Sequence, residues 1–409
     1  MKIGGIGAKL ISIAAIVGAL LIGLLSISGL LKQRRFARDE AVAQIQESAG
    51  DDFYLAGPYI SVPVRRIVKG EIRTSSVILK ASAVSARAVI GTEKRTVGIY
   101  TAPVFTGTLA VEARFDIHLP EGGSYEYLPG SASVYVAVKN SSLGGRPVFS
   151  LYGKEYSTGD IDVSDEKSNT LNYVGTVAAV RNGRLEFRAS IPIRGAGSFS
   201  IGPSGETTKL SVDCDWPSPG FTDFKYLPEK RSLRKDGFSA EWSVPFPEES
   251  KNSAIGFSYV QPVNLYQQLE RATTYGFLFI IVPFIVFFLF EIFAKIQLHP
   301  VHYLLSGAGC VIFFLLLLSF SEHISFGASY LAAAAAVSLL VSWYVGTASG
   351  RKSIGFAMIP VFGILYGFLF LSLGSEDNAL LIGALFAFAV LAALMICTRK
   401  VDWAGLGGK

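Results

Sequence analysis

The pattern of apolar and polar positions divides the chain into three parts, and the first is a single apolar run. Residues 10–31 hold no charged side chain over 22 positions. As a helix this run extends about 33 Å, enough to cross the ~30 Å hydrocarbon core of a bilayer. Lys2 and Lys9 precede it as in a signal peptide, but cleaved signal cores span only about 7–15 residues. The length favours an uncleaved anchor over a cleaved signal and makes residues 1–31 a cytoplasmic stub with a transmembrane anchor.

The second part, residues 32–274, has short alternating runs broken by Gly, Pro, Asn and Ser. After a short polar helix expected at 33–48, this pattern is typical of antiparallel strands. In residues 111–118 the odd positions are apolar and the even ones polar, and 185–191 repeat the pattern. One face of each strand is then buried and the other is wet. We therefore predict a mainly-β, antiparallel, sandwich-like domain.

In the third part the apolar runs return, each long enough to span a bilayer and separated by short connectors. The runs are 275–293, 302–320, 328–348, 354–373 and 379–397. Their frequent Gly and Ser residues suit close helix–helix contacts in lipid. The pattern predicts a five-helix transmembrane bundle over residues 275–397 and a cytoplasmic tail over 398–409. With the anchor, six spans are expected in a mixed membrane protein.

The charges beside the spans predict their orientation. With the N-terminus inside, every Lys and Arg outside the large domain falls on the cytoplasmic side, whereas the opposite short loops at 321–327 and 374–378 hold neither residue. The positive-inside rule then places both termini in the cytoplasm and the β domain in the periplasm. Four cations conflict with this rule because they follow the first span on the outer side, although long domains translocate largely regardless of such charges. They are Lys32, Arg34, Arg35 and Arg38.

Composition agrees with a membrane protein. Half of the residues are hydrophobic, and the mean hydropathy of +0.42 is unusual for a soluble chain of this size. The net charge of +5 does not indicate nucleic-acid binding, because the stretch from Lys32 to Arg271 holds 29 basic and 27 acidic residues. Three cysteines build no disulfide framework and no paired zinc motif. We expect contact with the lipid bilayer, no nucleic acid, no metal and no cofactor.

The most suggestive polar cluster is Glu291, Lys295, His299 and His302. Glu291 and Lys295 are one helical turn apart, so an ion pair at the cytoplasmic boundary is expected, with the lysine reaching to water. His299 and His302 are three residues apart, a spacing that suits a metal or proton-relay site. Pro300 between them instead predicts a helix start with His299 as a cap or loop residue. The structural interpretation is favoured, but both stay open, because an ionisable group inside a membrane is a functional candidate by default.

Ser321, Glu322 and His323 form a second cluster at the end of the third helix. Glu322 and His323 are either an acid–base pair or a helix end that emerges into water. The second interpretation is favoured, since a perturbed pair requires burial.

In the large domain, Asp213, Asp215 and Trp216 form an acidic, aromatic loop before Pro217. This loop either contacts a ligand or is a Trp–Pro packing turn, which is the commoner arrangement. No GxSxG, Walker, HExxH or nucleotide fingerprint is present. We therefore expect no catalytic residues and no enzyme activity.

Several stretches that run from the beginning to the end of the chain together resemble one family. They are 56–63 (AGPYISVP), 95–104 (RTVGIYTAPV), 214–219 (CDWPSP), 237–242 (GFSAEW), 262–267 (PVNLYQ), 270–276 (ERATTYG), 298–305 (LHPVHYLL) and 315–323 (LLLLSFSEH). In combination they resemble the CreD family of bacterial inner-membrane proteins, which is associated with cell-envelope integrity. The resemblance implies the inner membrane of a Gram-negative cell and a link to envelope-stress and β-lactam responses under two-component control. It supplies no active site.

Three functions are weighed. The leading expectation is a non-enzymatic envelope-integrity factor whose outer domain contacts periplasmic or envelope proteins while the bundle anchors or transduces. A transporter or permease for an envelope-related small molecule is the first alternative, although the last three helices are almost free of charge, which counts against proton coupling. A membrane-bound enzyme acting on envelope material is the second, and requires a nucleophile or carboxylate pair in a cleft.

Overall fold

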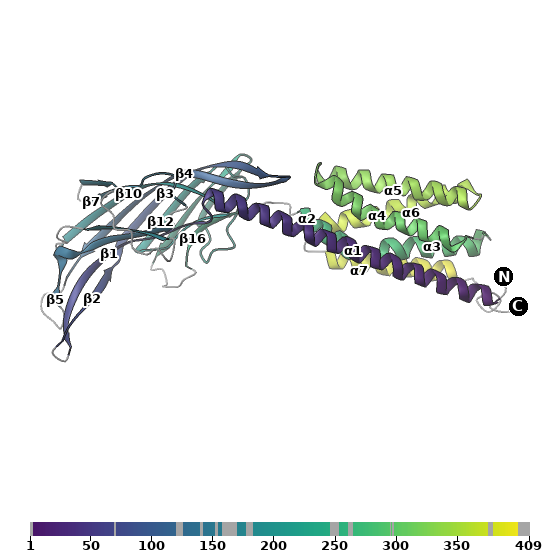
Figure 1. Ribbon diagram of the computed structural model, residues 1–409, viewed down its shortest axis with the longest axis horizontal. Coiled ribbons are helices and arrows are strands. Elements are labelled where there is room, and N and C mark those ends of the chain that lie inside the picture. Colours follow the sequence, from purple (N-terminus) through teal and green to yellow (C-terminus); the bar gives the residue numbers. More distant parts are fainter. Residues whose placement is uncertain are drawn as a thin grey trace. The chain divides into compact units, whose positions relative to one another are not determined.

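The computed structural model of the 409-residue chain shows helices at both ends of the sequence and strands between them (Figure 1). The structure describes residues 3–68, 71–119, 126–139, 142–151, 154–157, 170–176, 183–245, 253–260, 265–294, 296, 298–374 and 379–399. The chain divides into two compact units. Residues 1–37 and 263–409 form one, called here the membrane unit, and residues 38–262 form the other, the β unit.

Helix α1 (Ile3–Ala49) contributes to both units as one unbroken helix of 47 residues. The anchor and the polar helix expected at 33–48 are therefore a single element. Residues 32–48 contain neither Gly nor Pro and are rich in good helix formers, so nothing interrupts the helix where the polar sequence begins. It ends at Gly50, whose φ of 117° suits only glycine and whose amide donates to the Gln46 carbonyl.

Among its described residues, the β unit holds two eight-stranded sheets. Sheet 1 has the order β13 (Pro219–Gly220), β16 (Ile255–Tyr259), β11 (Ser198–Ile201), β1 (Phe53–Val68), β6 (Ser133–Lys139) and β9 (Thr170–Thr176), with β2 (Glu71–Leu79) and β5 (Glu126–Tyr127) also paired with β1. Sheet 2 has the order β14 (Lys230–Arg234), β15 (Gly237–Pro245), β12 (Gly205–Cys214), β3 (Ala81–Val97), β4 (Tyr100–Ile117), β10 (Gly183–Ala196), β7 (Val148–Leu151) and β8 (Lys154–Ser157). A short 3-10 helix, η1 (Pro129–Ser131), precedes β6.

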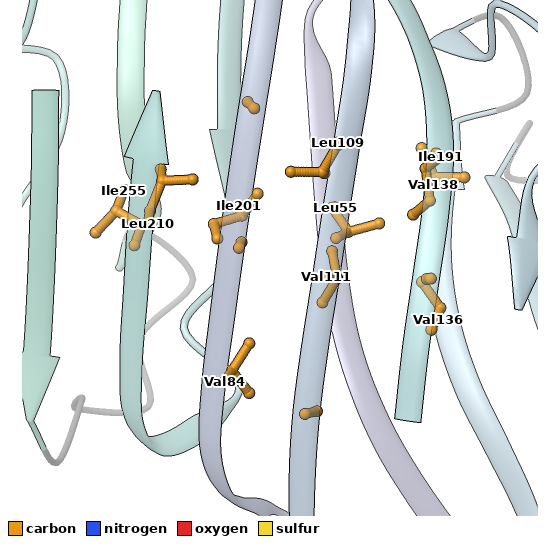
Figure 2. Packing of buried hydrophobic residues seen from close by; sticks show 14 of the residues in the cluster. Leu55, Val84, Leu109, Val111, Val136, Val138, Ile191, Ile201, Leu210 and Ile255 are labelled. Atoms are coloured by element: carbon orange, nitrogen blue, oxygen red, sulfur yellow. The ribbon is translucent and has the colours of Figure 1, made fainter. Parts of the chain in front are cut away.

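Alternation along the strands builds one apolar core between the sheets. In β4 the side chains of Val111, Ala113, Phe115 and Ile117 are buried, and the polar residues between them are exposed. Figure 2 shows buried side chains that come from strands of both sheets. The mainly-β, sandwich-like domain is thus confirmed. The expectation of purely antiparallel pairing needs a correction, because β1 pairs with β11 and β12 with β3 in parallel.

The last turns of α1 pack on the β unit. Ile45 and Ala49 are buried in a small cluster with Ala102 and Val104 of β4 and Ala196 of β10. Just after the helix ends, the Asp51 carbonyl accepts a hydrogen bond from the Ala196 amide. The helix therefore enters the domain as part of its packing and not as a free tether.

After the strands, the described part of the membrane unit continues with six helices. They are α2 (Leu265–Thr274), α3 (Leu278–Ala294), α4 (Pro300–Ser321), α5 (Phe326–Ala348), α6 (Lys352–Gly374) and α7 (Ala379–Thr398). Within the described residues six helical stretches, counting α2 with α3, are long and apolar enough to cross a membrane, one near the N-terminus and five near the C-terminus. The predicted spans are confirmed. Helix α2, assigned above to the domain at 32–274, belongs instead to the membrane unit.

Close packing of α1 against this bundle depends on a glycine. A Cβ atom at Gly307 of α4 would collide with Leu20 of α1 and approach Phe284 of α3 to 2.9 Å. Glycine therefore lets three helices meet at one point, as small residues do at helix interfaces in lipid.

Candidate functional site

A hydrogen-bonded ion pair in the membrane unit joins α1 to α3. The Lys9 ammonium of α1 lies 2.6 Å from Oε1 and 2.7 Å from Oε2 of Glu291 on α3. The same ammonium donates to the Leu298 carbonyl at 2.6 Å, and the Leu298 amide donates to Glu291 Oε1 at 2.8 Å. The three donors of the lysine are therefore all used, and both carboxylate oxygens accept.

This ion pair is largely removed from solvent. The side chains of Lys9 and Glu291 are 16% and 10% exposed. Beside them is the buried ring of Tyr303, whose centroid is 5.9 Å from the ammonium. That ring packs edge-on against Phe284 and Phe287. Aromatic walls lower the local dielectric, so each charge depends on the other for its stability.

The structure gives Glu291 a partner that is 282 residues away in the sequence. Its expected pairing with Lys295 concerns a residue outside the described ranges and stays a prediction. His299 is the N-cap of α4, where its Nδ1 accepts from the Val301 amide at 3.3 Å and Pro300 is the first helical residue. The cap interpretation is confirmed.

His302 has a different partner from His299. Its Nδ1 is 2.8 Å from the Tyr344 hydroxyl of α5. The structure therefore uses one imidazole to begin a helix and the other to join α4 to α5. Among the described residues no group of three His, Cys, Asp or Glu side chains is arranged to hold a metal ion.

A second set of contacts holds α1 about one membrane thickness further along. Glu322 at the end of α4 is 10% exposed, with Oε1 3.8 Å from Arg34 Nε and 3.4 Å from the Tyr266 hydroxyl. Arg35 Nη1 is 3.3 Å from Glu270 Oε2 on α2, with both side chains about half exposed. Lys9 and Arg34 are separated by about 37 Å of helix, slightly more than a hydrocarbon core. Helix α1 is thus fastened to the bundle at both ends of its span.

These contacts revise the interpretation of the second cluster. Glu322 does not emerge into water, because it is mostly buried and faces a cation from another helix. His323 is exposed, and the Ser321 hydroxyl donates to the carbonyls of Leu317 and Leu318 one turn earlier. The preferred interpretation is therefore wrong for Glu322 and right for His323.

In the β unit the acidic, aromatic loop is a packing turn. Trp216 Nε1 donates to the Ser218 carbonyl at 3.0 Å, and its ring lies against Tyr259 at 5.6 Å between centroids. Asp213 accepts from Arg234 at 2.9 Å on the surface, where such a pair contributes about 0–1 kcal/mol. Asp215 is exposed.

The cysteine beside this loop is buried, and its thiol has low reactivity as a nucleophile. Cys214 Sγ is 3.6 Å from the Tyr259 hydroxyl, and burial raises the pKa of both groups. A thiol held in its neutral form is a poor nucleophile.

The described residues contain one span fastened at both ends, a two-sheet unit that follows it in sequence, and five further candidate spans. These features define a multi-pass membrane protein with a β domain inserted after the first span. A family model described as "Inner membrane protein CreD" matches residues 5–404. The chain belongs to the CreD family of inner membrane proteins. It is similar to the inner membrane protein CreD of Escherichia coli (strain K12), with 26% identity over 423 residues that cover 97% of this chain and 93% of that protein.

Sequence reasoning missed Lys9 and Arg34 as site residues because their partners are hundreds of positions away. Two signals were nevertheless present. Lys9 and Glu291 are each a charged residue at the edge of an apolar run. The four cations that conflict with the positive-inside rule include Arg34 and Arg35, and the structure pairs both with carboxylates.

Proposed function

We propose that this chain is a non-enzymatic envelope-integrity factor of the inner membrane. Its β unit faces the periplasm and contacts envelope proteins there, both termini are cytoplasmic, and the role belongs to the response to envelope stress and β-lactams. The observation that carries the proposal is the construction of α1. One unbroken helix is fastened to the bundle at both ends of its span, and its last turns pack in a small apolar cluster with β4 and β10 of the β unit.

This construction suits anchoring or transduction. A domain that only has to stay near the membrane needs no more than a flexible linker, and such a linker lets the domain and its anchor move independently. Here the end of α1 is part of the packing of the β unit, and the same helix holds Lys9 in the membrane unit. We infer that α1 is the element through which an event at the β unit reaches the membrane unit. Coupling of this kind uses rigid elements that both sites contact.

The charge distribution supports the proposed orientation. Arg34 and Arg35 stand on the side that the positive-inside rule assigns to few cations, and each has a carboxylate partner. Long domains cross largely regardless of such charges. The cations that follow the first span therefore do not overturn the orientation that the other flanking charges favour.

Photo-crosslinking in cells tests the proposed contacts. A photoreactive amino acid replaces Ile72 or Ile78 of β2, or Leu233 of β14, whose side chains are 70%, 63% and 58% exposed. Phe388 of α7, 71% exposed in the membrane unit, is the matched control. We expect protein adducts from the β-unit positions only, with protection against detergent and β-lactams unchanged. If none of the three β-unit positions yields an adduct more than the control does, the proposed contacts are wrong.

A transporter is the second candidate, because the membrane unit buries hydroxyl groups that lack a hydrogen-bond partner. Among the described residues these include Ser306, Ser342, Tyr366 and Ser372. Unpaired polar groups in a bundle interior are costly and mark functional positions in transporters. Ser342→Ala separates the candidates: a transporter loses protection at normal abundance, whereas an anchoring factor retains it.

A further inference from the structure

A groove of about 480 Å³ runs along α1 in the membrane unit. Its walls are one face of α1, the facing side of α2, and Phe277 in the turn that follows α2. The α1 side chains recur at three- and four-residue intervals from Leu21 to Arg35, so they form one continuous stripe. The volume is within the range of small-molecule sites, about 300–1,000 Å³.

The groove changes character along its length. At one end Leu21, Leu25 and Phe277 present apolar surface, and Leu25 is 70% exposed. At the other end are Lys32, Arg35 and Glu270. The stripe from Leu21 to Arg35 covers about 21 Å of helix and crosses the point where the uncharged run of α1 ends. The groove therefore passes from the hydrocarbon region to the level of lipid headgroups.

The polar end carries excess positive charge. Two cations, Lys32 and Arg35, lie beside one carboxylate, that of Glu270. Arg35 forms an ion pair with Glu270 at 3.3 Å, and the side chains of this pair are each about half exposed. Lys32 has no ion pair among the described residues. An anion with an apolar tail matches both ends at once: its charge is placed near Lys32 and Arg35, and its tail follows the leucines.

A groove of this volume, apolar at one end and basic at the other, suits an extended acyl chain that ends in an anionic head. We propose that the groove binds one anionic phospholipid, with its phosphate at Lys32 and Arg35 and one acyl chain along Leu21, Leu25 and Phe277.

Binding is tested on the purified full chain in a neutral detergent. Phosphatidylglycerol and phosphatidylcholine with identical acyl chains are titrated separately, and bound lipid is counted by native mass spectrometry. The double variant Lys32→Gln/Arg35→Gln should weaken phosphatidylglycerol binding roughly tenfold or more, because each cation near a membrane surface contributes to anionic-lipid affinity. Phosphatidylcholine binding should not change. The matched control is Arg351→Gln/Lys352→Gln, which removes two exposed cations outside the groove and should leave both affinities unchanged.

A second variant tests the apolar half. Ser28 lines the groove between its two ends, so Ser28→Phe should fill it and weaken binding of both lipids. The proposal is overturned if wild type binds the two lipids equally, or if the control variant loses as much phosphatidylglycerol as the double variant. It is also overturned if wild type is a dimer that Ser28→Phe converts to a monomer, since the groove then holds a second copy. The measurement uses purified protein and does not depend on the envelope role.

Discussion

Breaking the Lys9–Glu291 pair should strongly destabilise the membrane unit. In Glu291→Met the Lys9 ammonium keeps one acceptor, the Leu298 carbonyl, and the Leu298 amide loses its acceptor. In Lys9→Met the carboxylate keeps that amide. Removing one member of a buried ion pair costs about 3–5 kcal/mol. The loss of stability should therefore be near the upper end of this range for Glu291→Met and near the lower end for Lys9→Met.

The double variant Lys9→Met/Glu291→Met is the decisive comparison. It removes both charges at similar side-chain volume, and apolar replacement of a buried pair is often neutral or stabilising. We expect it to be less destabilised than either single variant, which corresponds to a coupling free energy above about 5 kcal/mol. A free energy of about 5 kcal/mol changes the folding equilibrium constant more than a thousandfold.

The assay is unfolding of the full chain in detergent micelles, followed by loss of helical circular dichroism. Lys352→Met, at an exposed cation, is the control and should change stability by less than about 0.5 kcal/mol. Additive effects of the two single variants would show that the side chains do not depend on each other, and the account of α1 as a fastened helix would then be wrong.

Three further predictions concern packing and the β unit. Residues 38–262 produced alone should fold with a mainly-β circular dichroism spectrum, and a predominantly helical spectrum would contradict the fold. Gly307→Ala should destabilise the membrane unit by about 1–3 kcal/mol because its Cβ meets Leu20, whereas Gly363→Ala, with nothing within 4 Å, should not; equal melting temperatures would refute the close contact. Burial raises the pKa of Cys214, so its contribution to stability is complete below the ordinary thiol pKa of about 8.5 and is lost as pH rises above it, when the unfolded thiol ionises. Cys214→Ala should reduce the fall in β-unit stability between pH 8 and 10. An unchanged slope would show that ionisation of this thiol does not cause the fall.

Much of the fold could be predicted because it depends on local periodicity. Strand β4 alternates between apolar and polar side chains, and each later span is a long apolar run with polar ends. The parallel pairings of β1 with β11 and of β3 with β12 could not be predicted, because alternation shows which face is buried and not which strand is the neighbour.

The candidate site was predicted only in part for a similar reason. Glu291 stood out as a charge inside an apolar context, and the nearest opposite charge in the sequence was Lys295. Spacing rules within one helix cannot detect Lys9, which approaches only when α1 packs on α3 and α4. The cap at His299, in contrast, follows from Pro300 next to it and was predictable.

Fusions to alkaline phosphatase test the central claim most directly, since this enzyme is active only in the periplasm. In the proposed topology the β unit is outside, the start of α6 is inside and both termini are in the cytoplasm. A fusion after Asn172 in β9 should therefore be active, and one after Lys352 should be inactive at similar abundance. Activity at Lys352, or its absence at Asn172, would contradict the proposed six-span topology with a periplasmic β unit.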